Sequence, residues 1–463
     1  MATDAEAAQI PDSAQPPVKK REIFGWAMYD FANSSYTTVV ISVIYSAFFT
    51  GHIIPADSEL RDTYWTIAIV ASTLLALILS PFVGAVCDYS GGKKRYLALS
   101  TVVCALSTMA LFFVGPGDFY LAIVLIMISN AAFMIGESFC GSFLTDLANK
   151  KNMAMISGLG WGLGYFGGLM SLVLVMGLIT ATPEENMADF IQQNQIAMIA
   201  IGIFFALSAV PTFALVRERS TPAPGFENAS FGKLMAAGLK EFADSYKLAR
   251  RYKTLFKFFI AFMIYMAGLE IIIKFVGIYA NQELAMTQKE LTVVFLVIQV
   301  SAALGALAFG FLEARIGPKP TVMATIAWWI IGSLAIFFLP NIAEITGQKP
   351  VHIFYAISLI AGGGIGSIQS SSRTVVGLLS PASRSAQMFG FWGTFSRLAI
   401  ILGLVVFGPM SDMLGRRYAI LSVAAFFAIG GLVLLFVPIE EGIKEAEAAD
   451  KEDAEAAKNG AAA

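Results

Sequence analysis

Two opposite charges four residues apart stand out within an apolar stretch of the chain. Glu270 and Lys274 lie inside residues 256–280, a run rich in Phe, Ile and Met that is long enough to cross a bilayer as one helix. Residues four apart share one helix face. Because a lone Lys or acid at a bilayer centre costs roughly 2.5 to 3.5 kcal/mol on insertion scales, that face should point at a water-filled cavity or a partner. The pair is therefore either a substrate or proton site, or a self-neutralising link between neighbouring helices.

The composition of the chain is that of a membrane protein. Of its 463 residues, 57% are hydrophobic and 14% are charged, whereas soluble proteins carry about 25% charged residues. The net charge of -2 implies no basic surface for nucleic acid. The cysteines and histidines have no metal-ligand spacing, and no Ser/His set or Gly-rich phosphate loop is present. We therefore expect no metal, no cofactor, no enzymatic activity and no ATP-driven step.

Apolar runs long enough to span a bilayer recur twelve times along the chain. The long loop after the sixth run divides them into two groups of six. This pattern predicts an all-α polytopic membrane protein with 12 transmembrane helices in two six-helix pseudo-repeats. The predicted spans are 24–50, 63–86, 96–114, 119–146, 153–180, 195–216, 254–280, 290–312, 320–339, 351–379, 386–409 and 417–438.

The charged residues set the expected orientation and domain limits. Lys and Arg concentrate in the N-terminal tail, in the loops after even-numbered spans and in the C-terminal tail. By the positive-inside rule both termini should be cytoplasmic, and we expect a monomer in a bacterial inner membrane. The predicted regions are a disordered tail (1–22), a six-helix bundle (23–216), a cytoplasmic linker (217–253), a second bundle (254–438) and an acidic disordered cytoplasmic tail (439–463). A frayed helix is the alternative for the last tail.

The linker has a helical repeat of apolar residues with lysines between them. The apolar positions are Phe231, Met235, Leu239, Phe242 and Tyr246. This spacing is typical of an amphipathic helix lying at the inner membrane surface. An ordinary linker helix fits the same pattern.

The short loop after the second span carries an acid followed by a basic cluster. Its motif is formed by Gly84, Asp88, Gly91 and Lys93. Such a loop can lock two helices by charge, or it can be a plain charged turn. A related pattern recurs after the eighth span, at Gly310, Gly317 and Lys319. Similar loops at equivalent places of the two halves indicate an internal repeat.

Twelve spans with this loop between the second and third resemble the major facilitator superfamily. The resemblance covers about residues 22–438. Finer features are similar to the vacuolar amino-acid effluxers linked to autophagy and their bacterial relatives. These features are WAMYDFANSSY at 26–36, SGLGWGLGYFGG at 157–168, and Gln369, Ser372 and Arg373. In the seventh span that branch has an Asn-Asp pair after the tyrosine, where this chain has Met266 and Ala267 and carries its acid at Glu270.

The resemblance implies that the first, fourth, seventh and tenth helices line a central cavity. Each of these spans carries polar groups, although Ser, Thr and Asn in such helices also serve as helix–helix hydrogen bonds. The expected substrate- and proton-binding residues are Asp30 and Asn33, Asn130 and Glu137, Glu270 and Lys274, and Gln369 and Arg373. The motif of Gly84, Asp88, Gly91 and Lys93 is expected to gate the inner mouth.

Two further features lie in the eleventh span and its end. Arg397 falls in mid-membrane and needs an anionic partner that one sequence does not name. Gly408, Asp412, Gly415, Arg416 and Arg417 match the loop motif letter for letter. Helix counting places this second match on the outer side, so we interpret it as a turn.

These observations predict a secondary active transporter with alternating access. The expected partners are a small solute, protons and the lipid bilayer, and the resemblance points to amino-acid efflux. Lys274 and Arg373 are the expected partners of a substrate carboxylate. The alternatives are a drug or sugar permease of the same fold and a membrane sensor or scaffold that transports nothing.

Overall fold

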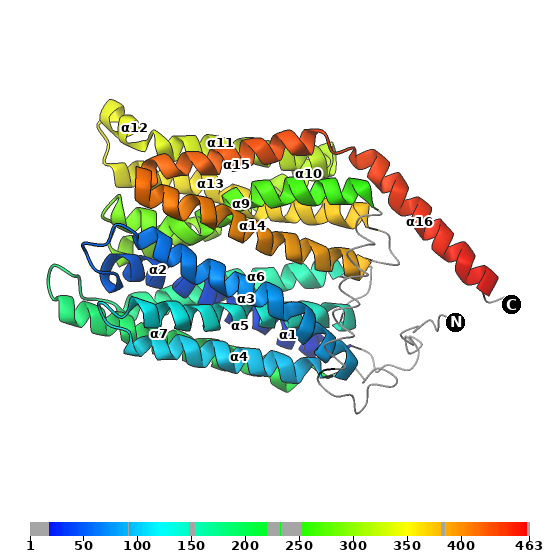
Figure 1. Ribbon diagram of the computed structural model, residues 1–463, viewed down its shortest axis with the longest axis horizontal. Coiled ribbons are helices and arrows are strands. Elements are labelled where there is room, and N and C mark those ends of the chain that lie inside the picture. Colours follow the sequence, from blue (N-terminus) through cyan, green and yellow to red (C-terminus); the bar gives the residue numbers. More distant parts are fainter. Residues whose placement is uncertain are drawn as a thin grey trace.

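The described part of the protein is built of helices packed side by side. The structure is a computed structural model that describes residues 18–90, 92–147, 153–219, 232, 252–380 and 385–460. Within these residues there are helices and no strand, and the long helices run roughly parallel to one direction (Figure 1). The prediction of an all-α fold is confirmed.

The first group of helices covers the N-terminal part of the chain, and the second group covers the rest. The first comprises α1 (Lys20–Tyr36), η1 (Thr37–Val43), α2 (Ile44–Phe48), η2 (Phe49–Ile53), α3 (Arg61–Ser90), α4 (Lys93–Ala110), η3 (Leu111–Phe113), α5 (Phe119–Leu147), α6 (Met153–Leu178) and α7 (Met187–Leu215). The second comprises α9 (Lys253–Gln282), α10 (Gln288–Ile316), α11 (Pro318–Phe337), α12 (Leu339–Thr346), α13 (Pro350–Leu379), α14 (Ser385–Leu414), α15 (Arg416–Leu435) and α16 (Ile439–Gly460).

The helices are consistent with the predicted twelve spans. Ten segments of the described residues are long and apolar enough to cross a membrane, the first of them running continuously from α1 through η2. The long helices α6 and α10 lie at the other two predicted spans. The twelve lie where the apolar runs predict them, although α7 begins at Met187, eight residues before its predicted start. Asn186 caps that earlier start, because its side chain accepts from the backbone N–H groups of Ala188 and Asp189.

The same pattern of helix packing occurs in both halves. In the first half α1 packs on α6 and α7, α5 packs on α3 and α4, and α4 packs on α7. In the second half α9 packs on α14 and α15, α13 packs on α10 and α11, and α11 packs on α15. Each pairing recurs six spans later in the chain, so the two six-helix pseudo-repeats are confirmed.

The two halves meet mainly where α3 packs on α14. They also meet where α6 packs on α10, where α9 packs on η1 and α2, and where α10 packs on η1. We call the end of the bundle where α1 begins and α15 finishes the terminal end, and the opposite end, where α14 meets α15, the distal end (Figure 1).

The first span is not a uniform α-helix. η1 and η2 are π-helical and flank the short helix α2. The η1 sequence TTVVISV is dominated by β-branched residues, which lower helix propensity. Gly277 of α9 lies against this segment, and a Cβ there would overlap the carbonyl oxygens of Ser42 and Val43. The wider turn and the missing side chain let the two halves approach closely at this point.

The C-terminal tail contains a helix. Residues 439–460 form α16, so of the two predicted forms of this tail the structure has the helical one. The tail is rich in Ala, Glu and Lys, which favour helix. Ile439, Ile443 and Ala446 recur at helical spacing, and Ile439 and Ala446 are only 7% and 4% exposed. α16 contacts α9 and α13, and this packing fixes its first turns.

The N-terminal boundary also moves. The helix α1 starts at Lys20, two residues before the predicted end of the disordered tail. The carboxylate of Glu22 is fully buried and lies 2.8 Å from the Arg219 guanidinium after α7. Residues 1–17, 220–231 and 233–251 lie outside the described residues, and the predicted amphipathic helix of the linker falls among them.

Glycines let α1 and α6 pack closely, which gives a test of the fold. A Cβ at Gly167 would overlap the backbone of Phe31, whereas one at Gly177 would meet nothing within 4 Å. Both Gly→Ala changes add helix propensity, so their difference reports packing. We expect Gly167→Ala to be less stable than Gly177→Ala by about 1–3 kcal/mol. Thermal unfolding of the two purified variants in detergent measures this, and equal melting temperatures would contradict the close α1–α6 contact.

Candidate functional site

Six charged side chains act on one another within the membrane-spanning helices. Asp30 lies within electrostatic range of Glu137 and Arg373, and Glu137 lies within range of Arg397, Lys274 and Glu270. We call these six residues the central charge cluster. They come from α1, α5, α9, α13 and α14, and so from both halves. Three acids balance three bases, so the cluster is neutral when all six are ionised.

Asp30 is held where α1 meets α6. Its side chain is half-buried, and a Cβ at Gly160 would overlap its Oδ2 atom. The glycine therefore provides the room that the carboxylate occupies. One turn earlier, Trp26 Nε1 donates a 2.8 Å hydrogen bond to the Cys140 carbonyl and joins α1 to α5.

Glu137 and Ser138 are exposed although they lie within a membrane-spanning helix. Their neighbours Phe139 and Cys140 are only 5% and 2% exposed. Arg397 Nη2 of α14 donates a 2.6 Å hydrogen bond to Ser138 Oγ. The exposed face of α5 thus looks toward α14 in the other half, and the accessible space there lies between the halves.

Glu270 and Lys274 form the ion pair that their spacing predicts. Lys274 Nζ lies 3.4 Å from Glu270 Oε2, and Lys274 is 8% exposed. The pair neutralises itself within α9 and also lies within electrostatic range of Glu137. This geometry is compatible with both predicted roles, the site and the link between helices.

Arg373 and Gln369 lie one turn apart on α13. The Arg373 guanidinium carbon is 5.4 Å from the centre of the Trp392 ring, a cation–π distance. Gln369 is half-buried. Between them in sequence, Ser372 Oγ shares a 2.7 Å hydrogen bond with the Tyr265 hydroxyl and fixes α13 to α9.

The two predicted asparagines have different surroundings. Asn130 is 2% exposed, and its Nδ2 donates a 2.7 Å hydrogen bond to Ser72 Oγ on α3. This contact is a helix–helix link, so we leave Asn130 out of the cluster. Asn33 is 6% exposed, and its Oδ1 accepts no hydrogen bond from the residues that the structure describes.

The predicted gating motif lies at the terminal end. Gly84 and Asp88 fall in the last turns of α3, and Lys93 begins α4 with its Nζ 6.0 Å from the centre of the Phe143 ring. The side chain of Asp88 and all of Gly91 lie outside the described part of the chain. The role of Asp88 at this mouth stays a prediction.

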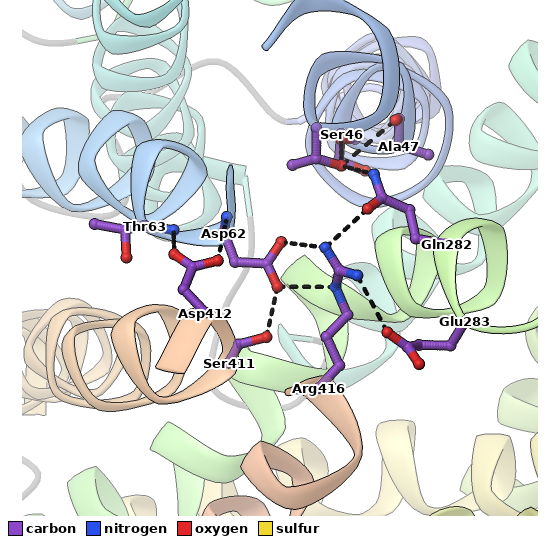
Figure 2. Close-up of polar contacts among 10 residues, drawn as sticks. Ser46, Ala47, Asp62, Thr63, Gln282, Glu283, Ser411, Asp412 and Arg416 are labelled. Carbon is purple, nitrogen blue, oxygen red and sulfur yellow. Dashed lines mark hydrogen bonds and ion pairs between the residues drawn. The ribbon is translucent and has the colours of Figure 1, made fainter. Parts of the chain in front are cut away.

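A second polar network closes the distal end. Arg416 at the start of α15 donates to both carboxylate oxygens of Asp62 at the start of α3, from Nε and Nη2, each at 2.9 Å (Figure 2). Ser411 Oγ donates a 2.5 Å hydrogen bond to Asp62 Oδ2, whose side chain is 1% exposed. Charge-assisted pairs of this two-point kind are among the stronger polar contacts.

Asp412 adds a helix cap to this network. Its carboxylate accepts hydrogen bonds from the backbone N–H groups of Asp62 at 3.0 Å and Thr63 at 2.7 Å. A carboxylate at a helix N-terminus satisfies free N–H groups and favours the helix dipole. Gly408 lets α14 approach, since a Cβ there would overlap the Thr66 side chain. The acid of one half thus caps a helix of the other half.

Arg416 also reaches the end of α9. It donates to Gln282 Oε1 at 2.8 Å and to Glu283 Oε1 at 3.2 Å, and Gln282 Nε2 in turn donates to Thr50 Oγ1 of η2 at 2.8 Å (Figure 2). We call the set Asp62, Gln282, Glu283, Ser411, Asp412 and Arg416 the distal latch.

The distal latch adds to one interpretation made from the sequence. The second motif match, which ends at Arg417, forms the predicted turn, since Gly415 with a φ of 86° separates α14 from α15, and its residues also join the two halves. The letter-for-letter match with the inner loop motif was the sequence signal for this contact between the halves. Counting helices alone did not reveal the contact. The adjacent Arg417 behaves differently, since it donates to the Phe337 carbonyl at 3.0 Å and to Asn341 Oδ1 at 2.6 Å within its own half.

Comparisons with known proteins agree with this architecture. The family described as "Vacuole effluxer Atg22 like" matches residues 62–447. The "Uncharacterized MFS-type transporter YxiO" of Bacillus subtilis is 25% identical over 419 residues, which is 90% of this chain and 94% of that protein. "Autophagy-related protein 22" of Kluyveromyces lactis is 23% identical, covering 95% of this chain and 97% of that protein.

Solved structures share the fold at low identity. The "D-xylose-proton symporter" superposes with a TM-score of 0.67 at 16% identity, covering 91% of this chain and 99% of that chain. The nucleoside transporter NupG gives 0.64 at 16% identity, covering 90% of this chain and 98% of that chain. The chain therefore belongs to the Atg22-like vacuole effluxer family and is a multi-pass transporter with the major facilitator fold.

Proposed function

We propose that this transporter moves a small zwitterionic solute, such as an amino acid, outward and in exchange for protons. The observation that carries the proposal is the central charge cluster, in which charged side chains from both halves lie within electrostatic range of one another. A zwitterion needs a carboxylate for its ammonium group and a cation for its carboxylate, and the cluster offers both. Ionisable groups inside a membrane protein typically mark such pathways.

Asp30, Glu137 and Glu270 are the proposed proton carriers, with Asn33 and Gln369 beside the cargo. Each acid lies within range of at least one cationic side chain of the cluster. Loss or gain of one proton therefore changes the charge balance of a neutral cluster, and it changes which groups must be paired. Such a change can favour one arrangement of the two halves over the other.

The distal latch supports an assignment of the structure to one state of the transport cycle. We place the distal end outside the cell and both termini in the cytoplasm, following the distribution of Lys and Arg. The described contacts of the latch then belong to a state that is closed on the outside. Rocking of one half against the other, around the cluster, would break the latch and open the outer side.

A sugar or drug permease is the main alternative, because one fold hosts many cargoes. The solved structures of similar fold include a D-xylose–proton symporter and a nucleoside transporter. A cluster with three charges of each sign favours a zwitterion over a neutral sugar. A sensor or scaffold without transport would not need charges between its halves.

Transport by purified protein in liposomes tests the proposal. With a pH gradient imposed, we expect wild-type protein to accumulate at least one of the twenty L-amino acids. Asp30→Asn and Glu137→Gln should each lower gradient-driven transport by at least about tenfold while exchange without a gradient persists. Glu344→Gln, on the exposed helix α12, is the control and should transport normally. Xylose uptake with no amino-acid uptake would reject the proposal in favour of a sugar permease.

The ion pair in α9 has its own test. If Glu270 carries protons, Glu270→Gln should abolish gradient-driven transport and spare exchange. The double change Glu270→Gln/Lys274→Met should then stay uncoupled. If the pair only links helices, each single change should destabilise the protein, since it leaves one buried partner unpaired, and the double change should restore both stability and coupled transport. Transport assays and melting curves of the three variants distinguish these outcomes.

The distal latch can be tested with two adjacent arginines. We expect Arg416→Gln to open the distal end, because it removes the bonds that join the halves, whereas Arg417→Gln removes bonds within one half. The readout is labelling of Ala47→Cys, a position only 2% exposed on α2, by a membrane-impermeant maleimide. The labelling rate of Ala47→Cys should rise at least about tenfold in the Arg416→Gln variant, which corresponds to about 1.4 kcal/mol. Equal rates in both arginine variants would show that the network does not control opening.

A further inference from the structure

Arg397 is a cation of the central charge cluster, and its described hydrogen bonds go to neutral groups. It lies in the middle of α14, and its Nη2 donates to Ser138 Oγ at 2.6 Å and to the Met134 carbonyl at 3.4 Å. Both acceptors belong to α5 in the other half. The carboxylate of Glu137 lies within electrostatic range of the guanidinium.

The other two cations are engaged differently. Lys274 is ion-paired with Glu270 at 3.4 Å on its own helix. Arg373 lies over the Trp392 ring and within range of Asp30. A hydroxyl and a carbonyl compensate a guanidinium charge less well than a carboxylate does. The described hydrogen bonds of Arg397 therefore leave it suited to accept an additional anion.

The face of α5 that Arg397 contacts is exposed. Ser138 and Gly141 are one turn apart on α5, both are exposed, and a Cβ at Gly141 would meet nothing within 4 Å. A charged Arg inside a membrane is costly unless it is paired, and its planar fork of N–H groups matches the two oxygens of a carboxylate. The exposed face of α5 and the charge of the Arg397 guanidinium thus meet at Ser138.

We propose that Arg397 and Ser138 form the subsite that binds the carboxylate group of the cargo. This inference rests on the proposed function in assuming a cargo with a carboxylate, and it replaces the expectation that Lys274 and Arg373 bind that group. A bound carboxylate takes over the guanidinium donors that now reach Ser138 and Met134. Those bonds join α5 to α14, so cargo binding loosens a mid-membrane contact between the halves and favours their movement.

The first experiment needs no cargo. Gly141→Cys, in a background without the three native cysteines, is reacted with an anionic and a cationic methanethiosulfonate of similar size. We expect Arg397→Gln to lower the anionic-to-cationic rate ratio at least about threefold, and Arg397→Lys to preserve it. Ala56→Cys, in the exposed loop before α3, is the control position and should keep its ratio. An unchanged ratio at Gly141→Cys, or no labelling there by either reagent, overturns the proposal. Monodisperse elution of each variant checks its fold.

The second experiment separates this inference from the proposed function. Binding of the twenty L-amino acids to the full chain in nanodiscs is measured by thermal shift, followed by the carboxamide of each one that binds. We expect Arg397→Gln to weaken binding of the acid at least about tenfold and to leave the affinity for the carboxamide unchanged. Equal losses for both ligands, or no loss, overturn the carboxylate subsite. If wild-type protein binds no amino acid, the proposed cargo is wrong, and the labelling ratio alone decides the role of Arg397.

Discussion

Water is absent from the hydrocarbon core of a membrane, and the arrangement of this protein's charged groups follows from that fact. Each charge inside the spanning helices needs a partner, because its transfer from water is otherwise too costly. Here three acids and three bases from five helices share one region between the halves. The fold provides such a region because its helices form two bundles with a common interface. Because the charged site is formed by both bundles, its contacts change whenever the bundles move against each other.

The distal latch illustrates how the repeat architecture places polar contacts. The helices α3 and α14 run side by side across the interface in opposite directions, so the end of one lies beside the start of the other. At the distal end, Asp412 near the end of α14 caps the start of α3. The motif around Asp88 lies near the end of α3, beside the start of α14. By the same geometry, Asp88 at the terminal end is predicted to act on the start of α14 and so to form the inner gate. The Asp412 cap at the distal end is the counterpart of this predicted gate.

The sequence was most informative about features that depend on a single helix. Hydropathy located the twelve spans, and the four-residue spacing of Glu270 and Lys274 implied the pair that forms. It could not assign contacts between helices far apart in the chain. Ser138, the partner of Arg397, lies 259 residues away from it in the chain. Asn130 and Glu137 lie on the same helix, yet Asn130 bonds to Ser72 of α3 whereas Glu137 lies within range of Arg397 of α14. The sequence did not decide between disorder and a helix for α16, because its apolar positions are few and its first turns pack on a surface formed by α9 and α13.

The position of α16 matters for anyone who handles this protein. Gly442 in its first turn lies so close to Thr254 and Leu379 that even a methyl group would overlap them. These two residues stand at the start of α9 and the end of α13, the helices that carry Glu270, Lys274 and Arg373. The rest of α16 extends from the bundle as a lever (Figure 1). A truncation that removes the first turns of α16 therefore removes contacts at the ends of the two helices that carry Glu270, Lys274 and Arg373.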